Sequence, residues 1–334
     1  MINKVLIANR GEIAVRVIRA CREMGIETVA VYSTIDANAL HTQLADEAYC
    51  IGPPAPKDSY LNAYNLLSAA SISGADAIHP GYGFLSENSK FVRMCNKSNV
   101  IFIGPDADAM EKMGDKLMAR RIMTEADVPI IPGSLEALKN AREAKKIAKK
   151  IGYPVMIKAA NGGGGRGIRK VDQEADLEDA FDAAYKEALG AFGDGTLYME
   201  KCIMDARHIE VQIMCDNHGN AVYLYERECS LQRRNQKVME EAPSIAFGDD
   251  KRREIGEAAV RAAKASGYKN AGTIEFLYDE QSGNYYFMEL NARVQVEHPV
   301  TEMITGKDIV REQILVANGA KLSFEQKDIP LMGH

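Results

Sequence analysis

The stretch Asn161-Gly162-Gly163-Gly164-Gly165-Arg166-Gly167 stands between two short apolar runs, residues 154–158 and 168–171. Ordering five glycines costs conformational entropy, and proteins commonly offset this cost with backbone amides that close over phosphate oxygens. A Walker A motif is excluded, because no Gly-Lys-Ser/Thr sequence follows and the loop leads into a strand. The stretch therefore predicts a phosphate-gripping loop between two strands, with a bare flexible hairpin as the alternative.

Toward the N-terminus, short apolar runs alternate with stretches of helical spacing. The expected strands are residues 4–8, 28–32, 75–78 and 100–103, and the expected helices begin near Gly11, Leu61 and Ser89. This alternation is typical of a parallel sheet covered by helices. We therefore predict an α/β N-terminal domain over residues 1–113.

The turn after the first strand raises the question of dinucleotide binding. Asp36 follows the second strand at about the distance expected of a ribose-binding acid. Only Gly11 is present where the dinucleotide fingerprint needs three glycines. We therefore interpret this turn as a scaffold element whose helix start could still hold an anion.

The pattern changes from about residue 114 onward. Longer alternating runs, such as residues 209–215 and 222–225, predict a mixed, largely antiparallel α+β domain over residues 114–334. The stretch Ile131-Pro132-Gly133 predicts a hinge into an inserted lid of about residues 131–203.

Composition narrows the class of protein. The net charge of -6 argues against a nucleic-acid surface, and the basic run at residues 145–150 has the spacing of a solvated helix face. The six cysteines form no C-x-x-C pair, which favours a reducing compartment. No window reaches the ~18 apolar residues that a membrane span requires. We therefore expect a cytoplasmic protein with neither nucleic-acid nor membrane partners.

Two carboxylates oppose each other in a predicted hairpin. If residue 277 pairs with residue 287, then Glu275 pairs with Glu289, and like charges directly opposite each other are destabilising without a cation or a proton between them. Asn291 lies on the same face and adds a neutral oxygen suited to a hard cation. The three residues predict a Mg²⁺ site, with two exposed strand carboxylates as the alternative.

Further charged groups extend this chemistry. Arg293, Gln295 and Glu297 alternate along a segment expected to be extended, so an Arg fork and an amide could hold a small planar anion while a carboxylate takes its proton. A structural salt bridge is the alternative for this triplet. Lys116 and Lys158 are available to neutralise triphosphate oxygens, although either alone is more often a surface lysine.

Several segments, in this order, resemble the biotin carboxylase family over the whole chain. They are residues 7–14, 79–88 and 113–116, the Gly-rich loop, and residues 295–302. The resemblance implies an ATP-grasp fold, in which a lid carrying the Gly-rich loop closes over ATP. It also implies carboxylation of biotin by bicarbonate through carboxyphosphate, as in the first half-reaction of acetyl-CoA carboxylase in fatty acid biosynthesis.

The same resemblance assigns roles to individual residues. For ATP it implies Lys116, Lys158, Gly163, Gly164, Gly165, Glu200, Lys201, Ile203, His208, Gln232, Glu275 and Glu289. For Mg²⁺ or Mn²⁺ it implies Glu275, Glu289 and Asn291, and for bicarbonate Lys237, Arg293, Gln295 and the backbone of Val296. Glu297 would be the base, with Lys237 and Arg293 as further catalytic residues.

The resemblance also implies partners. They are a biotin carboxyl carrier protein, carboxyltransferase subunits or domains, and a second copy of the chain, since Arg19 and Glu23 match the N-terminal part of the family's dimer surface. Family members continue beyond the position of His334, so we expect this chain to lack their C-terminal domain and one catalytic arginine, and to dimerise more weakly.

Two points leave alternatives open. Asn235 stands where the family commonly has a histidine near the nucleotide, which is expected to rearrange that contact. The alternative functions are another ATP-grasp ligase that joins a carboxylate to an amine, and an ATP-binding fragment without turnover.

Overall fold

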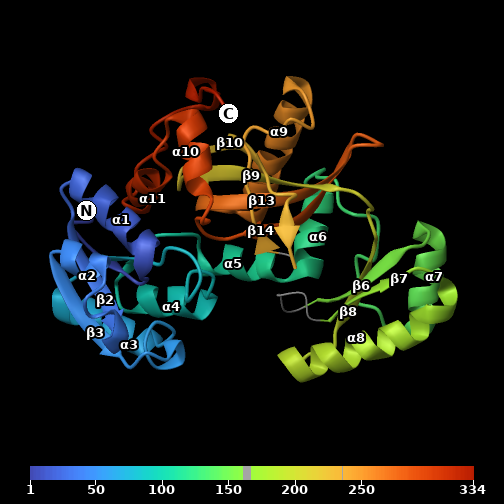
Figure 1. Cartoon of the computed structure of the whole chain (residues 1–334), viewed down its shortest axis with the longest axis horizontal. Helices are drawn as coiled ribbons and strands as arrows, with labels where there is room; N and C mark the ends of the chain where they lie inside the picture. Colours follow the sequence, from blue (N-terminus) through green and yellow to red (C-terminus); the bar gives the residue numbers. More distant parts are fainter. Residues whose placement is uncertain (161–166, 235) are drawn as a thin grey trace.

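Residues 4–102 contribute a five-stranded parallel sheet, here called the parallel sheet (Figure 1). The computed structural model describes residues 1–160, 167–234 and 236–334. The strand order is β3-β2-β1-β4-β5, and every neighbouring pair is parallel. The strands are β1 (Lys4–Ile7), β2 (Glu27–Ser33), β3 (Glu47–Gly52), β4 (Ala77–His79) and β5 (Ile101–Phe102). The predicted α/β architecture is confirmed.

Helices cover both faces of the parallel sheet, because its strands are apolar on both sides. Val5 and Ile7 pack with α1, while Leu6 packs with α3 and α4 on the opposite face. The helices of this region are α1 (Gly11–Glu23), α2 (Leu40–Leu44), α3 (Ala63–Ser73), α4 (Ser89–Lys97) and α5 (Ala107–Gly114). The edge strand β3 was not predicted, because its side chains are mostly half-buried or exposed and form no apolar run.

The acid considered for ribose binding is engaged within the protein. Asp36 is buried and bonds Arg10 at 2.6 Å and the Tyr60 hydroxyl at 2.6 Å. The hydrogen bond from Arg10 is the largest influence on this carboxyl and lowers its pKa well below the usual range. These contacts agree with the interpretation of this turn as a scaffold element.

The central sheet is antiparallel, as predicted, with the strand order β10-β9-β13-β14. Its strands are β9 (Arg207–Cys215), β10 (Ala221–Glu228), β13 (Asn270–Asp279) and β14 (Asn284–Asn291). One face is apolar and packs on α9 (Asp249–Ser266) through Ile209, Val211 and Ile274. The side chains that alternate with these residues lie on the opposite face, which carries the charged groups described below.

The hairpin of β13 and β14 contains a β-bulge. Glu275 pairs with Glu289, as predicted, but residue 277 pairs with residue 286, so the predicted pairing of 277 with 287 is wrong. Met288 is the extra residue, because Phe276 pairs with Phe287 and the next pair is Glu275 with Glu289. The bulge places Phe287 in the core and Glu289 on the opposite face, although they are two residues apart.

A small sheet lies at the far end of the molecule from the parallel sheet (Figure 1). It consists of β6 (Val155–Ala159), β7 (Ile168–Val171) and β8 (Leu197–Lys201) in the antiparallel order β7-β6-β8. Val155 and Ile157 face α7 (Ala141–Ile151) and α8 (Leu177–Phe192), so Lys158 lies on the other face. The basic run at residues 145–150 lies on α7 with its lysines partly or fully exposed, as predicted.

Five further elements complete the fold. They are α6 (Lys116–Glu125), the two-residue strands β11 (Gln232–Arg233) and β12 (Gln236–Lys237), and the helices α10 (His298–Thr305) and α11 (Ile309–Ala317). Among the described residues, no helix is both long and apolar enough to cross a bilayer.

Candidate active site

A row of charged residues crosses the central sheet, one from each strand. Arg227 pairs with Glu210, Glu210 with Glu275, and Glu275 with Glu289 in the register of the four strands. Three neighbouring carboxylates repel one another, so the row is stable only with cations around it. The sequence reasoning found two members of this row and missed Glu210 and Arg227.

Lys237 supplies one of these cations. It comes from β12 and its Nζ contacts a carboxylate oxygen of Glu210, Glu275 at 2.9 Å and Glu297 at 2.9 Å. Burial alone lowers the pKa of Lys237, but the three carboxylates raise it above its ordinary value. The ammonium therefore stays charged at neutral pH and links the central sheet to the start of α10.

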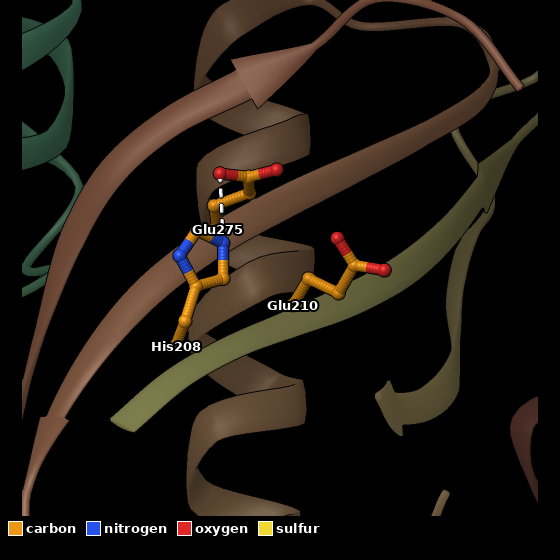
Figure 2. A group of neighbouring side chains, drawn as sticks. All are labelled: His208, Glu210 and Glu275. Carbon is orange, nitrogen blue, oxygen red and sulfur yellow. Dashed lines mark ion pairs between the residues drawn. The ribbon is translucent and has the colours of Figure 1, made fainter. Parts of the chain in front are cut away.

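His208 is the second side chain that contacts Glu275 from outside the row. Its Nε2 lies 2.9 Å from Glu275 Oε2, and the ring points at Glu275 while Glu210 lies to one side (Figure 2). Gln232 Nε2 approaches His208 Nδ1 at 3.2 Å, and because an amide nitrogen only donates, Nδ1 accepts and Nε2 carries the proton. Burial raises the pKa of Glu275, yet the contacts with His208 and Lys237 hold it well below its usual range.

Glu289 is the carboxylate of the row whose charge is least balanced by positive groups. Among the described residues it has no hydrogen bond or ion pair, and its side chain is exposed to solvent. Desolvation of the carboxylate by neighbouring protein atoms and the charge of Glu275 raise the pKa of Glu289. The charge of Lys116, at the start of α6, lowers it. A divalent cation bound by oxygen ligands would relieve the repulsion between Glu275 and Glu289.

Asn291 fits the predicted cation site less simply. Its Nδ2 donates to Glu275 Oε1 at 2.9 Å, and its Oδ1 accepts from Arg293 at 3.1 Å. The amide oxygen expected to be a ligand is therefore engaged by Arg293 and would have to exchange that contact for a cation.

The segment that follows β14 is not extended to its end as predicted. It enters a turn at Val296 and Glu297, and α10 begins at the next residue. Its three polar side chains still meet one network, since Arg293 contacts Asn291, Gln295 contacts Glu275 at 3.4 Å, and Glu297 contacts Lys237. The structural salt-bridge alternative is correct in part, because Glu297 and Lys237 form an ion pair.

Three of the residues assigned to ATP, Glu200, Lys201 and Ile203, lie at the end of β8 and just after it. Glu200 is buried, and its carboxylate lies between Arg120 Nη1 at 2.5 Å and Lys158 Nζ at 2.5 Å. Lys201 points away and donates to backbone carbonyls at residues 152 and 153. Ile203 follows β8 and is half-buried.

Some predicted residues lie outside the network or outside the described part of the chain. Val296 has an exposed side chain. Arg19 and Glu23 are exposed on α1. Gly163, Gly164, Gly165 and Asn235 lie outside the described residues, so their predicted roles stay predictions.

A signal for the missed residues was present in the sequence. His208, Glu210 and Gln212 alternate with the apolar residues Ile209, Val211 and Ile213, which places all three on one face. Arg227 follows the largely apolar first part of β10, and its side chain is fully buried. Buried charges in apolar strands need partners, so their presence predicts a charged network.

Comparison with known proteins gives consistent matches. Residues 1–110 match the family described as biotin carboxylase, N-terminal domain, and residues 115–325 match the carbamoyl-phosphate synthase L chain, ATP binding domain. The chain is 57% identical over 333 residues to biotin carboxylase 1 of Bacillus subtilis, which covers 100% of this chain and 74% of that relative.

Solved structures agree. A complex of Campylobacter jejuni biotin carboxylase with a β,γ-ATP compound has a TM-score of 0.95 and 52% identity, over 99% of this chain and 74% of that one. The biotin carboxylase domain dimer of Hydrogenobacter thermophilus 2-oxoglutarate carboxylase, with MgADP, ADP and bicarbonate, has a TM-score of 0.93 and 53% identity, over 99% and 73%.

Proposed function

Because the chain belongs to the biotin carboxylase family, we propose that it carries out the ATP-dependent carboxylation of biotin with bicarbonate. The observation that carries the proposal is the position of Glu297 and Gln295 beside the row of carboxylates. The candidate anion site and the candidate cation site thus meet at Glu275, which contacts both Lys237 and Gln295, and Lys237 in turn contacts Glu297. Phosphoryl transfer to bicarbonate requires this juxtaposition, since the reaction joins a small anion to a metal-bound triphosphate.

In the proposed first step, bicarbonate attacks the γ-phosphate of ATP and forms carboxyphosphate and ADP. Lys237 and Arg293 neutralise the anion, Gln295 and the backbone N–H of Val296 hold its oxygens, and Glu297 takes its proton. Lys237 already contacts Glu297 at 2.9 Å, which keeps the carboxylate oriented as a base needs to be. The Glu297 contact with Lys237 would loosen as the substrate anion enters.

In the proposed second step, carboxyphosphate breaks down to carbon dioxide and phosphate. The phosphate takes the ureido proton of biotin, and the resulting enolate attacks carbon dioxide to give carboxybiotin. Atoms and charge balance, since the proton lost by the ureido nitrogen ends on phosphate.

Glu275 and Glu289 have the chemistry to hold Mg²⁺ or Mn²⁺, and Asn291 would join them after releasing Arg293. A bound divalent ion would neutralise charge on the β- and γ-phosphates. The charge of Lys116, at the start of α6, acts on Glu289, and His208 lies between Glu275 and Gln232, which supports their proposed contacts with ATP.

The small sheet is proposed as the lid. We propose domains of residues 1–113 and 114–334, with a lid of about residues 131–203 that carries the Gly-rich loop. Lys158 and Glu200 lie on the face of the small sheet away from its helices, which supports a role next to the nucleotide. Lys201 and Ile203 would contribute through the backbone.

The partners follow from the family. Its members are subunits or domains of carboxylases, and one structural neighbour is a dimer. We propose a biotin carboxyl carrier protein and carboxyltransferase as partners, a homodimer that uses Arg19 and Glu23, a cytoplasmic location, and a place in acetyl-CoA carboxylase and fatty acid biosynthesis.

The test is bicarbonate-dependent release of ADP from ATP, measured with and without biotin. We expect ADP to form only when bicarbonate and Mg²⁺ are present, and to form faster with biotin. Glu297→Gln should lose this activity while binding of MgATP, measured by calorimetry, is unchanged. ADP formed with an amine substrate and not with bicarbonate would instead favour a carboxylate–amine ligase.

A further inference from the structure

Arg227 contacts several neutral side chains next to the candidate active site, in addition to its ion pair with Glu210. It is fully buried, and its Nε donates to Glu210 Oε1 at 2.5 Å. Its Nη1 donates to Gln212 Oε1 at 3.0 Å and to Thr301 Oγ1 at 2.7 Å. Its Nη2 donates to Gln295 Oε1 at 2.8 Å. The guanidinium therefore ties together β9 and β10 of the central sheet, the segment after β14 and the helix α10.

The contact with Gln295 fixes which end of that amide faces the site. A guanidinium has only donors, so the Gln295 atom that it contacts must be the carbonyl oxygen. The other end of the amide lies 3.4 Å from Glu275 Oε1, which is an acceptor and therefore requires the nitrogen there. Two neighbours of opposite character thus demand the same orientation of a side chain that is only 2% exposed.

We propose that Arg227 is a positioning residue that holds the Gln295 amide with its N–H groups toward the bicarbonate site. Bicarbonate offers oxygen acceptors, so an N–H group attracts it, whereas a carbonyl oxygen in the same place repels it. Turning the amide over would place a carbonyl oxygen against Glu275 and leave Arg227 Nη2 facing an amide nitrogen. The identity of the anion rests on the proposed function, but the orientation itself does not.

The backbone of Gln295 is held as firmly as its side chain. His298 Nδ1 lies 2.7 Å from the Gln295 carbonyl oxygen, so this ring nitrogen carries a proton and donates it. Burial lowers the pKa of His298 to about 4, which keeps the ring neutral. With its main chain fixed by His298 and its amide fixed by Arg227, Gln295 has little freedom to turn.

Arg227 could also affect the binding of bicarbonate through Glu210 and Lys237. It orients Glu210, and Glu210 contacts Lys237. Arg227→Lys keeps a positive charge beside Glu210 but has no second nitrogen in the geometry needed for Gln295. A double-mutant cycle with Gln295→Ala separates the two routes, because the route through the amide does not exist when Gln295 is alanine.

The kinetic test compares R227K in the wild-type and Q295A backgrounds. We expect R227K to raise the KM for bicarbonate about tenfold in the wild type and less than about threefold in Q295A, with the KM for MgATP within about twofold. An equal factor in both backgrounds would overturn the proposal and favour the route through Glu210. R252K is the matched control, since Arg252 makes a similar buried pair with Glu226 away from the site.

A second measurement does not depend on turnover. In protein labelled with ¹³C at the glutamine δ-carbons, the Gln295 signal is assigned by its absence from Q295A. It should move upfield in R227K, because its carbonyl loses a charged donor, and stay in place in R252K. An unmoved signal in R227K contradicts the proposal. If R227K does not fold, T301V, which removes one acceptor of Arg227, should give a smaller shift in the same direction.

The two measurements also separate this proposal from the proposed function. A wild-type chain that forms no ADP with bicarbonate would refute the function, while the NMR signal would still decide the orientation of Gln295.

Discussion

The central sheet and the small sheet each contain a buried glutamate between an arginine and a lysine. In the central sheet the three residues are Arg227, Glu210 and Lys237, and at the small sheet they are Arg120, Glu200 and Lys158. In both places the lysine is the residue proposed to meet an anion. The glutamate therefore holds the lysine ammonium group in place before the substrate arrives.

The two arrangements differ in what they connect. Arg227 and Glu210 lie on adjacent strands of one sheet, so their geometry is fixed by the strand register. Arg120 lies on α6, outside the small sheet, and it also donates to the carbonyls of Ile131 and Ser134, where the chain enters the region of the small sheet. The same set of charges thus shapes a binding site in one place and ties two parts of the molecule together in the other.

The largest expected effects on the kinetics come from replacing the two lysines, and the two replacements should affect different substrates. Lys237→Met leaves three carboxylates without their shared cation, so kcat/KM for bicarbonate should fall by about 100-fold or more. Lys158→Met should raise the KM for ATP about tenfold and leave the KM for bicarbonate unchanged. Steady-state kinetics of ADP release measures both. Equal effects of the two variants on both substrates would show that the two lysines have no separate roles.

The next comparison concerns stability. Glu210→Gln leaves Arg227 buried without its charged partner, which should lower the free energy of unfolding by about 3–5 kcal/mol. Glu200→Gln should cost less, about 1–3 kcal/mol, because Arg120 keeps two backbone carbonyls. Urea unfolding of both variants and the wild type gives the difference. A larger loss for Glu200→Gln would contradict the view that the central network is the more dependent on charge.

A smaller effect is expected at the end of the carboxylate row. Without metal, Glu289→Gln should raise the free energy of unfolding at neutral pH by about 0.2–1 kcal/mol, because it removes a like charge opposite Glu275. With Mg²⁺ the wild type should gain stability and the variant should not. Thermal unfolding with and without Mg²⁺ measures this, and Glu200→Gln, which should still respond to Mg²⁺, is the control.

The smallest effect concerns pH. Burial raises the pKa of Glu210, but Arg227 and Lys237 outweigh it and hold the pKa below its ordinary value of about 4.3. The folded state then binds fewer protons than the unfolded state, so the stabilisation is present above that value and is lost as pH falls through the folded pKa. The stability gap between wild type and Glu210→Gln should therefore narrow from pH 5 to pH 3. A constant gap in urea unfolding would contradict this.

Patterns that depend on neighbouring residues were predictable from the sequence. Apolar runs and helical spacing predicted the parallel sheet except for β3, whose residues make no apolar run. The assumed pairing of 277 with 287 predicted that Glu275 opposes Glu289. That pairing of the two carboxylates is confirmed, but the bulge at Met288 produces it, because residue 277 pairs with residue 286. The antiparallel character of the central sheet followed from the longer alternating runs.

Contacts between distant segments were not predictable in the same way. Glu210 is adjacent to Glu275 only because β9 lies beside β13, and strand order is not written in local spacing. Lys237 reaches both strands from a loop-like hairpin, and Arg120 meets Glu200 across 80 positions of sequence. Roles assigned by resemblance to Gly163, Gly164, Gly165 and Asn235 stay predictions.

The β-bulge at Met288 has a consequence for evolution. In an unbroken strand, the gain or loss of one codon turns every later side chain to the opposite face. Here Phe276 faces Phe287 and Glu275 faces Glu289, so losing the codon for Met288 would leave both pairs in place and make the ladder regular. The hairpin can therefore change length by one residue across generations without parting the two carboxylates.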